Sequence, residues 1–157
     1  MFVSDDSGND FIGFVFGYQS NRKFYVVIWK HENENADGSV GIGGIKGLQI
    51  KIVDSSTGPG TALATALWHT HDTADQINLL WHDPDMRGWE HRTPYTFHLI
   101  HRPSIGLIRV TIANDMEVLT DSGNVYDTTI LGGRLGVFQY NQTGVIWSNL
   151  RYTCGDR

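Results

Sequence analysis

Large apolar and small residues alternate along the stretch DFIGFVFGYQ, residues 10–19. A period of two is typical of a β-strand with one buried face. The expected core face consists of Ile12, Phe14, Phe16 and Tyr18. Gly13 and Gly17 fall on the other face, where glycine often marks a close approach of another backbone. We therefore expect a second segment to lie over them, either the acidic N-terminal segment or the loop 120–127.

The same strand pattern recurs along most of the chain. The segments that show it are 10–19, 23–30, 47–53, 94–101, 107–113, 117–121, 134–140 and 145–152. Segment 23–30 is apolar on both faces, which predicts a central strand. Segment 47–53 should bury three aliphatic residues and expose Gln49 and Lys51. Residues 134–140 and 145–152 read as a closing hairpin over the turn NQTG.

Only residues 61–68, TALATALW, read as a helix, of two turns at most. Many closely spaced strands with turn residues between them predict an all-β fold. We expect a two-sheet antiparallel β-sandwich or jelly roll, although the pattern does not give the strand order.

Length and charge narrow the class of protein. The chain has 157 residues, enough for one domain over residues 1–157. A net charge of −5 argues against nucleic acid as the main partner. No apolar run is long enough for membrane insertion, and residues 1–10 do not have the basic-then-apolar pattern of a signal peptide. We expect either a cytoplasmic protein or a piece of a larger one. Cys154 is the single cysteine, so it forms no internal disulfide.

Two oxygen-rich segments are candidates for calcium binding. Residues 1–9 form an acidic lead-in to the first long strand. The candidate ligands there are Asp5 and Asp6, together with Asp10 directly after this lead-in. Asp121 and Asp127 lie in a second segment, TDSGNVYD. Calcium takes six to eight oxygen ligands, which such segments supply. The alternative is that both segments are ordinary solvated turns.

Other metal and catalytic chemistry has less support in the sequence. His69 and His71 have a spacing that suits zinc on a strand, but no third ligand is indicated. Paired strand-borne carboxylates, as glycosidases need, are almost absent. No Gly-x-Ser-x-Gly motif is present. We therefore expect a protein that is not an enzyme.

The segment LWHDPDMRGWEHRTPY, residues 80–95, is a long connection rich in aromatic residues and arginine. Such loops often carry binding sites, so Trp81, Arg87, Trp89 and Arg92 are candidate partner-binding residues. The alternative is that the tryptophans fix the loop on the sandwich while the arginines pair with neighbouring acids.

Asn141 begins NQT, the only Asn-x-Ser/Thr sequon in the chain. A glycan must lie at the surface. Because we place this sequon at the tip of the closing hairpin, Asn141 is a candidate glycosylation site in a secreted product. The alternative is an accidental triplet that is never modified.

Several motifs resemble one family. In order they are DFIGFVFGYQS, KFYVVIWK, STGPG, ALWHT, LWHDP, HRPSIGLIRV, DSGNVYD and GGRLGVF. From about Asp5 to Cys154 the sequence resembles the C-terminal domain of thrombospondins. The resemblance implies a lectin-like sandwich of the legume-lectin (concanavalin-like) type in a secreted, calcium-binding matrix glycoprotein.

The resemblance also implies roles for particular residues. It implies Ca²⁺ ligands at Asp5, Asp6 and Asp10, and extends that role to Asp121 and Asp127. It implies a disulfide from Cys154 to an upstream segment that this sequence lacks. The implied partners are extracellular matrix proteins, cell-surface receptors or glycans, and any oligomerisation would use segments outside this chain.

Three functions therefore compete. The first is a calcium-binding adhesion module that is non-catalytic and acts outside the cell. The second is a carbohydrate-binding lectin domain. The third is a glycoside hydrolase-like sandwich.

Overall fold

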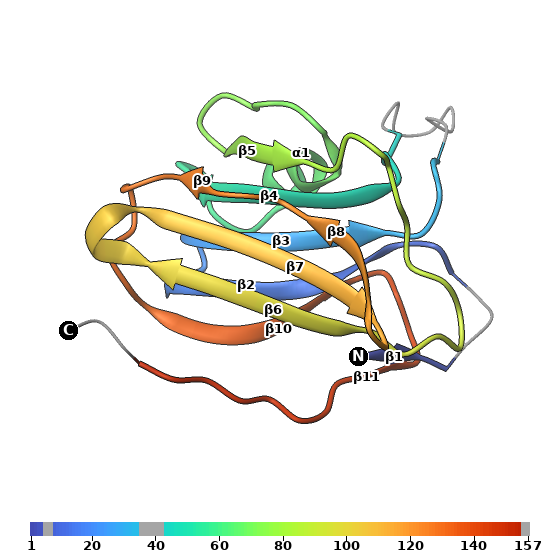
Figure 1. The fold of residues 1–157 in the computed structure, drawn as a ribbon. Helices are drawn as coiled ribbons and strands as arrows, with labels where there is room; N and C mark the ends of the chain where they lie inside the picture. The colour runs from blue at the N-terminus through green and yellow to red at the C-terminus, as the bar shows by residue number, and fades with distance from the viewer. Residues whose placement is uncertain (5–7, 35–42, 155–157) are drawn as a thin grey trace.

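A computed structural model describes residues 1–4, 8–34 and 43–154 as two facing antiparallel β-sheets (Figure 1). The strands are β1 (Phe2–Val3), β2 (Phe11–Ser20), β3 (Lys23–Lys30), β4 (Gly47–Asp54), β5 (Ile77–His82), β6 (Thr96–Arg102), β7 (Leu107–Asn114), β8 (Glu117–Asp121), β9 (Val125–Tyr126), β10 (Arg134–Tyr140) and β11 (Val145–Ile146). The α-helix is α1 (Thr61–Trp68), and a 3₁₀ turn, η1, covers Pro103–Ile105. No described helix is long and apolar enough to cross a membrane.

The larger sheet has the order β10-β2-β3-β4-β5, so β3 is central as its two apolar faces predict. The second sheet runs β6-β7-β8, and β9 pairs with β7. The two-residue strands β1 and β11 pair with each other near the edge of the sandwich. The all-β, two-sheet antiparallel sandwich is therefore confirmed.

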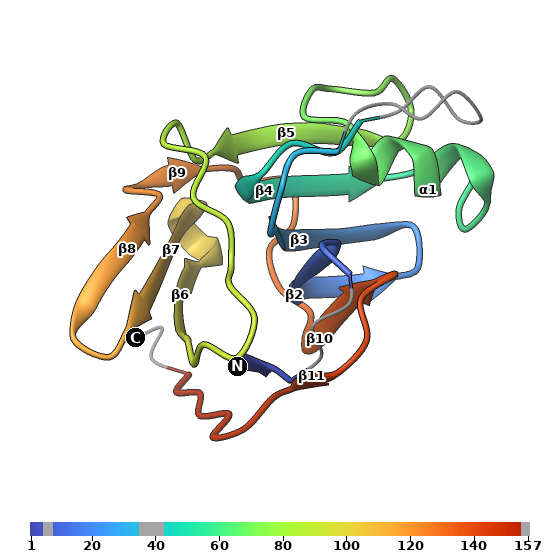
Figure 2. The same cartoon turned by 90° about the vertical axis from the view of Figure 1, so that its right-hand side faces the viewer.

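Two hydrophobic clusters hold the layers together. The main cluster fills the space between the sheets and includes Phe14, Tyr25, Trp29, Trp89 and Ile112, which all lie at least nine-tenths buried. A second cluster lies on the opposite face of the larger sheet, under helix α1 (Figure 2). Fully burying a large apolar side chain contributes about 1.5–3 kcal/mol. The larger sheet is thus covered on both faces, whereas the second sheet is covered on one.

Strand β2 departs from strict alternation at Gly17. Its φ of 59° lies in the left-handed region, and the register with β3 shifts between Phe16 and Ser20. This irregularity turns Tyr18 to the face that carries α1, where its ring lies 5.7 Å from Phe24. The expected place of Tyr18 in the core face is therefore wrong, because a bulge interrupts the period of two.

The glycines of β2 do mark close approaches, but not by the segments we expected. A Cβ at Gly17 would lie 3.1 Å from both Ile130 Cγ2 and Tyr25 Cδ2. At Gly13 a Cβ would lie 1.9 Å from the carbonyl oxygen of Val27 on the neighbouring strand. Within the described residues, the nearest contacts of these glycines thus come neither from the acidic segment nor from the loop 120–127.

The position of helix α1 also explains why the predicted exposure of two residues of strand β4 is wrong. Gln49 and Lys51 were expected to be exposed, yet both are fully buried. Helix α1 and the residues after it cover that face, and Lys51 Nζ donates to the carbonyl oxygens of Leu67 at 2.6 Å and His69 at 2.7 Å. The sequence pattern does not predict strand β5, because Ile77–His82 falls partly in the connection 80–95 and partly in the loop before it.

The predicted closing hairpin does not form. Strand β10 pairs with β2, whereas β11 pairs with β1. Asn141, directly after β10, has a φ of 58°, so the chain leaves the direction of the strand there. Among the residues described after that turn, up to Cys154, strand structure is limited to Val145–Ile146.

Candidate functional site

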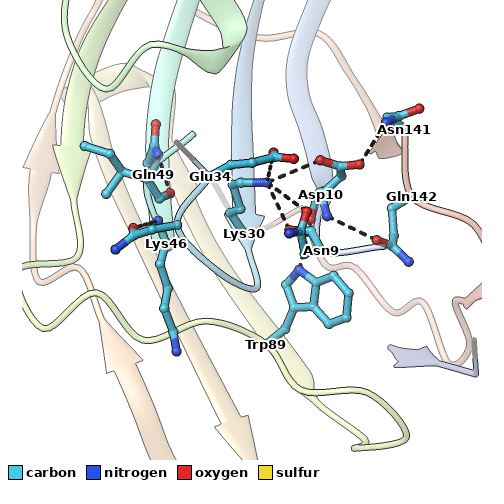
Figure 3. A network of polar contacts seen from close by, with 11 residues as sticks. Asn9, Asp10, Lys30, Glu34, Lys46, Gln49, Trp89, Asn141 and Gln142 are labelled. Atoms are coloured by element: carbon cyan, nitrogen blue, oxygen red, sulfur yellow. Dashed lines mark hydrogen bonds and ion pairs between the residues drawn. The ribbon is translucent and has the colours of Figure 1, made fainter. Parts of the chain in front are cut away.

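A buried charged cluster lies where strands β2 and β3 meet the N-terminal segment (Figure 3). Lys30, the last residue of β3, has no exposed side-chain surface. Its Nζ lies 3.2 Å from Asp10 Oδ1 and 2.9 Å from Glu34 Oε2. The backbone and side-chain oxygens of Asn9 lie 3.1 and 3.3 Å away. An ammonium has three donors, so these four oxygens satisfy Lys30 completely.

Aromatic rings and a glycine enclose the same ammonium. Lys30 Nζ lies 5.2 Å from the ring centre of Phe11 and 4.8 Å from that of Trp68, within the range of cation–π attraction. A Cβ at Gly44 would lie 2.7 Å from Lys30 Cε. The cluster thus joins the N-terminal segment, β3 and the end of α1.

Asp10 is held from several sides. Its second oxygen, Oδ2, accepts a hydrogen bond from Asn141 Nδ2 at 2.9 Å, and its backbone N–H donates to Gln142 Oε1 at 3.2 Å. Its carbonyl oxygen accepts from Trp89 Nε1 at 3.1 Å. The carboxylate thus contacts a cation and an amide of its own chain. Asp5 and Asp6 lie outside the described residues.

The other two predicted calcium ligands also have protein partners. Asp121 accepts from Arg109 Nε at 2.9 Å and Nη2 at 2.5 Å, and this guanidinium lowers the pKa of Asp121. Asp127 Oδ1 accepts from the Tyr25 hydroxyl at 2.5 Å and from Thr129 N at 2.8 Å. Burial and the bond to Asp127 raise the pKa of Tyr25.

These contacts decide how well the described carboxylates fit a calcium ion. Calcium needs several oxygens turned toward one point. Asp10 and Asp121 each face a basic side chain, which occupies the place that a cation would take. No group of three or more His, Cys, Asp or Glu residues in the described ranges is arranged to hold a metal. Among Asp10, Asp121 and Asp127 the structure therefore shows structural contacts and no calcium cage.

In the segment 80–95 the tryptophans contribute to the core. Trp89 is fully buried, and Trp81, on β5, packs partly buried against the main cluster. Trp29 Nε1 also donates to the Arg87 carbonyl at 2.6 Å. The role of fixing the loop is thus confirmed for Trp89, and its ring is not available to a ligand.

The arginines of this segment lie at the surface. Arg87 forms an ion pair with Asp85 across the turn that begins at Asp83. The buried Asp83 accepts from the backbone N–H groups of Asp85 and Arg87, both at 3.1 Å. Arg92 is exposed, has a φ of 54° and donates its backbone N–H to Val3. Arg87 and Arg92 thus remain the accessible candidates of the segment.

The two remaining predicted positions are accessible. Asn141 is exposed at the end of β10, and Cys154 is an exposed free thiol. The structure does not bring either one together with Asp121 or Asp127 in any described contact.

Sequence reasoning missed the buried lysines. Lys51 stands between two isoleucines of a strand and Lys30 directly follows an apolar run, and these positions were the available signal. For Lys51, burial lowers the pKa to about 7. The described pairing of Lys30 with Asp10 involves residues twenty positions apart, which a local pattern does not reveal.

The sequence of this chain is similar to those of several known proteins. The profile of the family described as Thrombospondin C-terminal region matches residues 1–156. The chain is 46% identical over 158 residues to Thrombospondin-2 of Gallus gallus. It is 47% identical over 156 residues to the Cartilage oligomeric matrix protein of Bos taurus, and likewise to Thrombospondin-4-B of Danio rerio.

These matches cover nearly all of this chain but little of each relative. They include 99%, 98% and 98% of the chain, in the order given, and only 13%, 21% and 16% of the relatives. The chain thus spans between about an eighth and about a fifth of the length of these relatives.

Proposed function

Because this chain belongs to the family of thrombospondin C-terminal regions, we propose that it is a non-catalytic adhesion module of a secreted matrix glycoprotein. It acts outside the cell and binds matrix proteins, cell-surface receptors or glycans. The bovine relative is itself named as a matrix protein, which supports this location.

The small volumes of the surface hollows support this proposal independently of the similarity to known proteins. Two hollows among the described residues have volumes of about 190 and 240 Å³. Sites for small molecules are commonly about 300–1,000 Å³ and are largely enclosed. A sandwich with such small hollows suits recognition of macromolecules across its surface better than conversion of a small substrate.

We also propose that the chain binds calcium, but through fewer residues than the sequence suggested. The contacts of Asp10 and Asp121 with basic side chains argue that these residues act within the fold. We propose that the acidic lead-in supplies calcium ligands through Asp5 and Asp6, whose hard oxygens suit that ion. A calcium ion bound there would hold the backbone of this segment in place.

Cell attachment tests the proposed function directly. The chain is coated on a surface, and the attachment of matrix-producing cells is counted with and without soluble chain as competitor. We expect attachment that the soluble chain inhibits. Equal attachment to this surface and to one coated with an unrelated sandwich domain contradicts the proposal.

Glycan recognition is a second candidate function. It is favoured by the many polar residues that line the pocket of about 190 Å³. Its polar lining is formed by Asp54, Asp75, Gln76, Asn78 and Thr129. Sugars are bound through such convergent polar groups. Screening on a glycan array tests this idea, with Asn78→Ala as the variant because Asn78 is exposed at this pocket. Trp89 is unsuitable for that test because its loss empties part of the core.

A further inference from the structure

The turn that follows strand β10 contains the sequon Asn141–Gln142–Thr143 and is firmly anchored. Gln142, its middle residue, is buried, and its Oε1 accepts from Asp10 N at 3.2 Å. Gly144 O accepts from Ser4 N at 2.8 Å. These contacts fix the turn against the N-terminal segment.

The two residues that define the sequon are more exposed than Gln142. Asn141 and Thr143 are exposed on either side of the buried Gln142. The φ of 58° at Asn141 places it at the point where the chain leaves the sheet. Neither Asn141 nor Thr143 belongs to a hydrophobic cluster, so a bulky group on the exposed Asn141 is compatible with the packed core.

The amide nitrogen of Asn141 makes a contact that such a group can preserve. Asn141 Nδ2 donates to Asp10 Oδ2 at 2.9 Å, and Asp10 is itself the buried partner of Lys30 (Figure 3). A side-chain amide has two N–H groups, of which this contact uses one. The second is available for substitution while the first keeps its acceptor.

We propose that Asn141 carries an N-linked glycan whose amide stays bonded to Asp10 at the end of strand β10. In the transfer, Nδ2 forms a bond to C1 of the first N-acetylglucosamine of a lipid-pyrophosphate-linked oligosaccharide. The bond from C1 to the pyrophosphate oxygen breaks, the lipid pyrophosphate leaves, and one amide proton is lost. The remaining N–H continues to donate to Asp10.

This inference rests on the secretion that the proposed function requires, and it adds a restriction to that function. A glycan on this turn covers the surface around Asn141 and the adjoining end of β10. The macromolecular partner of the adhesion module therefore binds elsewhere on the sandwich.

The test uses the chain secreted from mammalian cells behind an added signal peptide, so it does not depend on cell attachment. Peptide mapping after amidase treatment in heavy-oxygen water reports modified Asn141. We expect a glycan on wild type and on Thr143→Ser, which keeps the sequon, and none on Thr143→Ala. Unmodified Asn141 in a well-secreted wild-type product overturns the proposal.

Two ways of removing the glycan then test the contact with Asp10. An endoglycosidase leaves one N-acetylglucosamine and the amide on high-mannose material, and we expect its product to keep the melting temperature of the untreated glycoprotein. The amidase converts the residue, in effect Asn141→Asp, and sets two carboxylates side by side. We expect a lower melting temperature after the amidase, and equal melting after both enzymes contradicts the bond to Asp10.

Discussion

Lys51 lies in the middle of strand β4 with its whole side chain buried, and its described contacts are two carbonyl oxygens at the end of helix α1. A neutral amine has two N–H groups, which matches these two acceptors. Burial lowers the pKa of Lys51 to about 7, because an ammonium loses its hydration there. The residue is thus a neutral amine in the folded protein above that pH.

This lowered pKa makes stability depend on pH in a definite direction. Between about pH 7 and about pH 10.5 the unfolded chain holds the Lys51 proton while the folded protein releases it. Stability therefore falls as the pH falls through this window, by about 1.4 kcal/mol per pH unit at most, and levels off below it. We expect urea denaturation to show this slope in wild type and its loss in Lys51→Met. Parallel pH profiles for the two proteins contradict the assignment.

Gly17 offers a second test at the scale of one residue. A side chain there meets Ile130 and Tyr25 and must adopt a φ of 59°. We expect Gly17→Ala to lower the free energy of unfolding by about 1–3 kcal/mol, by overpacking and backbone strain. Gly136→Ala is the control, because a Cβ there would lie 3.6 Å from Val15 Cγ2, an ordinary van der Waals distance. Equal effects of the two substitutions, measured by urea denaturation, contradict the close approach.

Residue-scale features were only partly predictable from the sequence. The apolar face of β2 was correct at Ile12, Phe14 and Phe16, because alternation follows from strand geometry alone. The bulge at Gly17 and the burial of Lys51 depend on Ile130 and on helix α1, which are distant in sequence. Local periodicity holds no information about such contacts.

Among the elements, the N-terminal segment and strands β2 and β3 are joined by the buried pair of Asp10 and Lys30. Removing one partner of a buried ion pair typically costs about 3–5 kcal/mol, and the lower end applies here because Glu34 remains beside Lys30 at 2.9 Å. We expect Asp10→Ala to lose stability of that order in urea denaturation. The pair of Lys23 with Asp54 is exposed, so Asp54→Ala should lose at most about 1 kcal/mol. Similar losses for both variants contradict the structural role of Asp10.

Element boundaries were predicted well where the strands are long. Residues 23–30 and 134–140 were predicted at the bounds that the structure gives for β3 and β10. Pairing was predicted poorly, because nearness in sequence suggested a hairpin after β10. The pairing of β11 with β1 joins opposite ends of the chain, and no turn signal encodes it.

For the whole molecule, the calcium assignment predicts a change in thermal stability. An ion that binds the folded state alone adds about 2.7 kcal/mol at a hundredfold excess over Kd. We expect a chelator to lower the melting temperature of wild type. The double variant Asp5→Asn, Asp6→Asn should lose this shift, whereas Asp121→Asn should keep it because Asp121 is bonded to Arg109. An unchanged melt in a sample shown to contain calcium contradicts the assignment.

The sequence alone predicted the family and the fold class correctly, but it predicted the roles of the candidate site residues only in part. Irregular motifs spread along the whole chain indicated the family, and the family profile confirms it. The tryptophans and carboxylates were chosen by residue type, which does not distinguish a ligand from a structural contact. Trp89 and Asp10 show why, since each is fixed by partners from distant segments.

The central claim is that the folded sandwich itself binds matrix macromolecules across its surface. The most direct measurement is binding of the secreted chain to cell-derived matrix as a function of temperature, in parallel with its unfolding transition. We predict saturable binding that disappears as the protein unfolds, and that disappears at a lower temperature in Asp10→Ala. Absence of saturable binding, or binding that persists unchanged through unfolding, contradicts the claim.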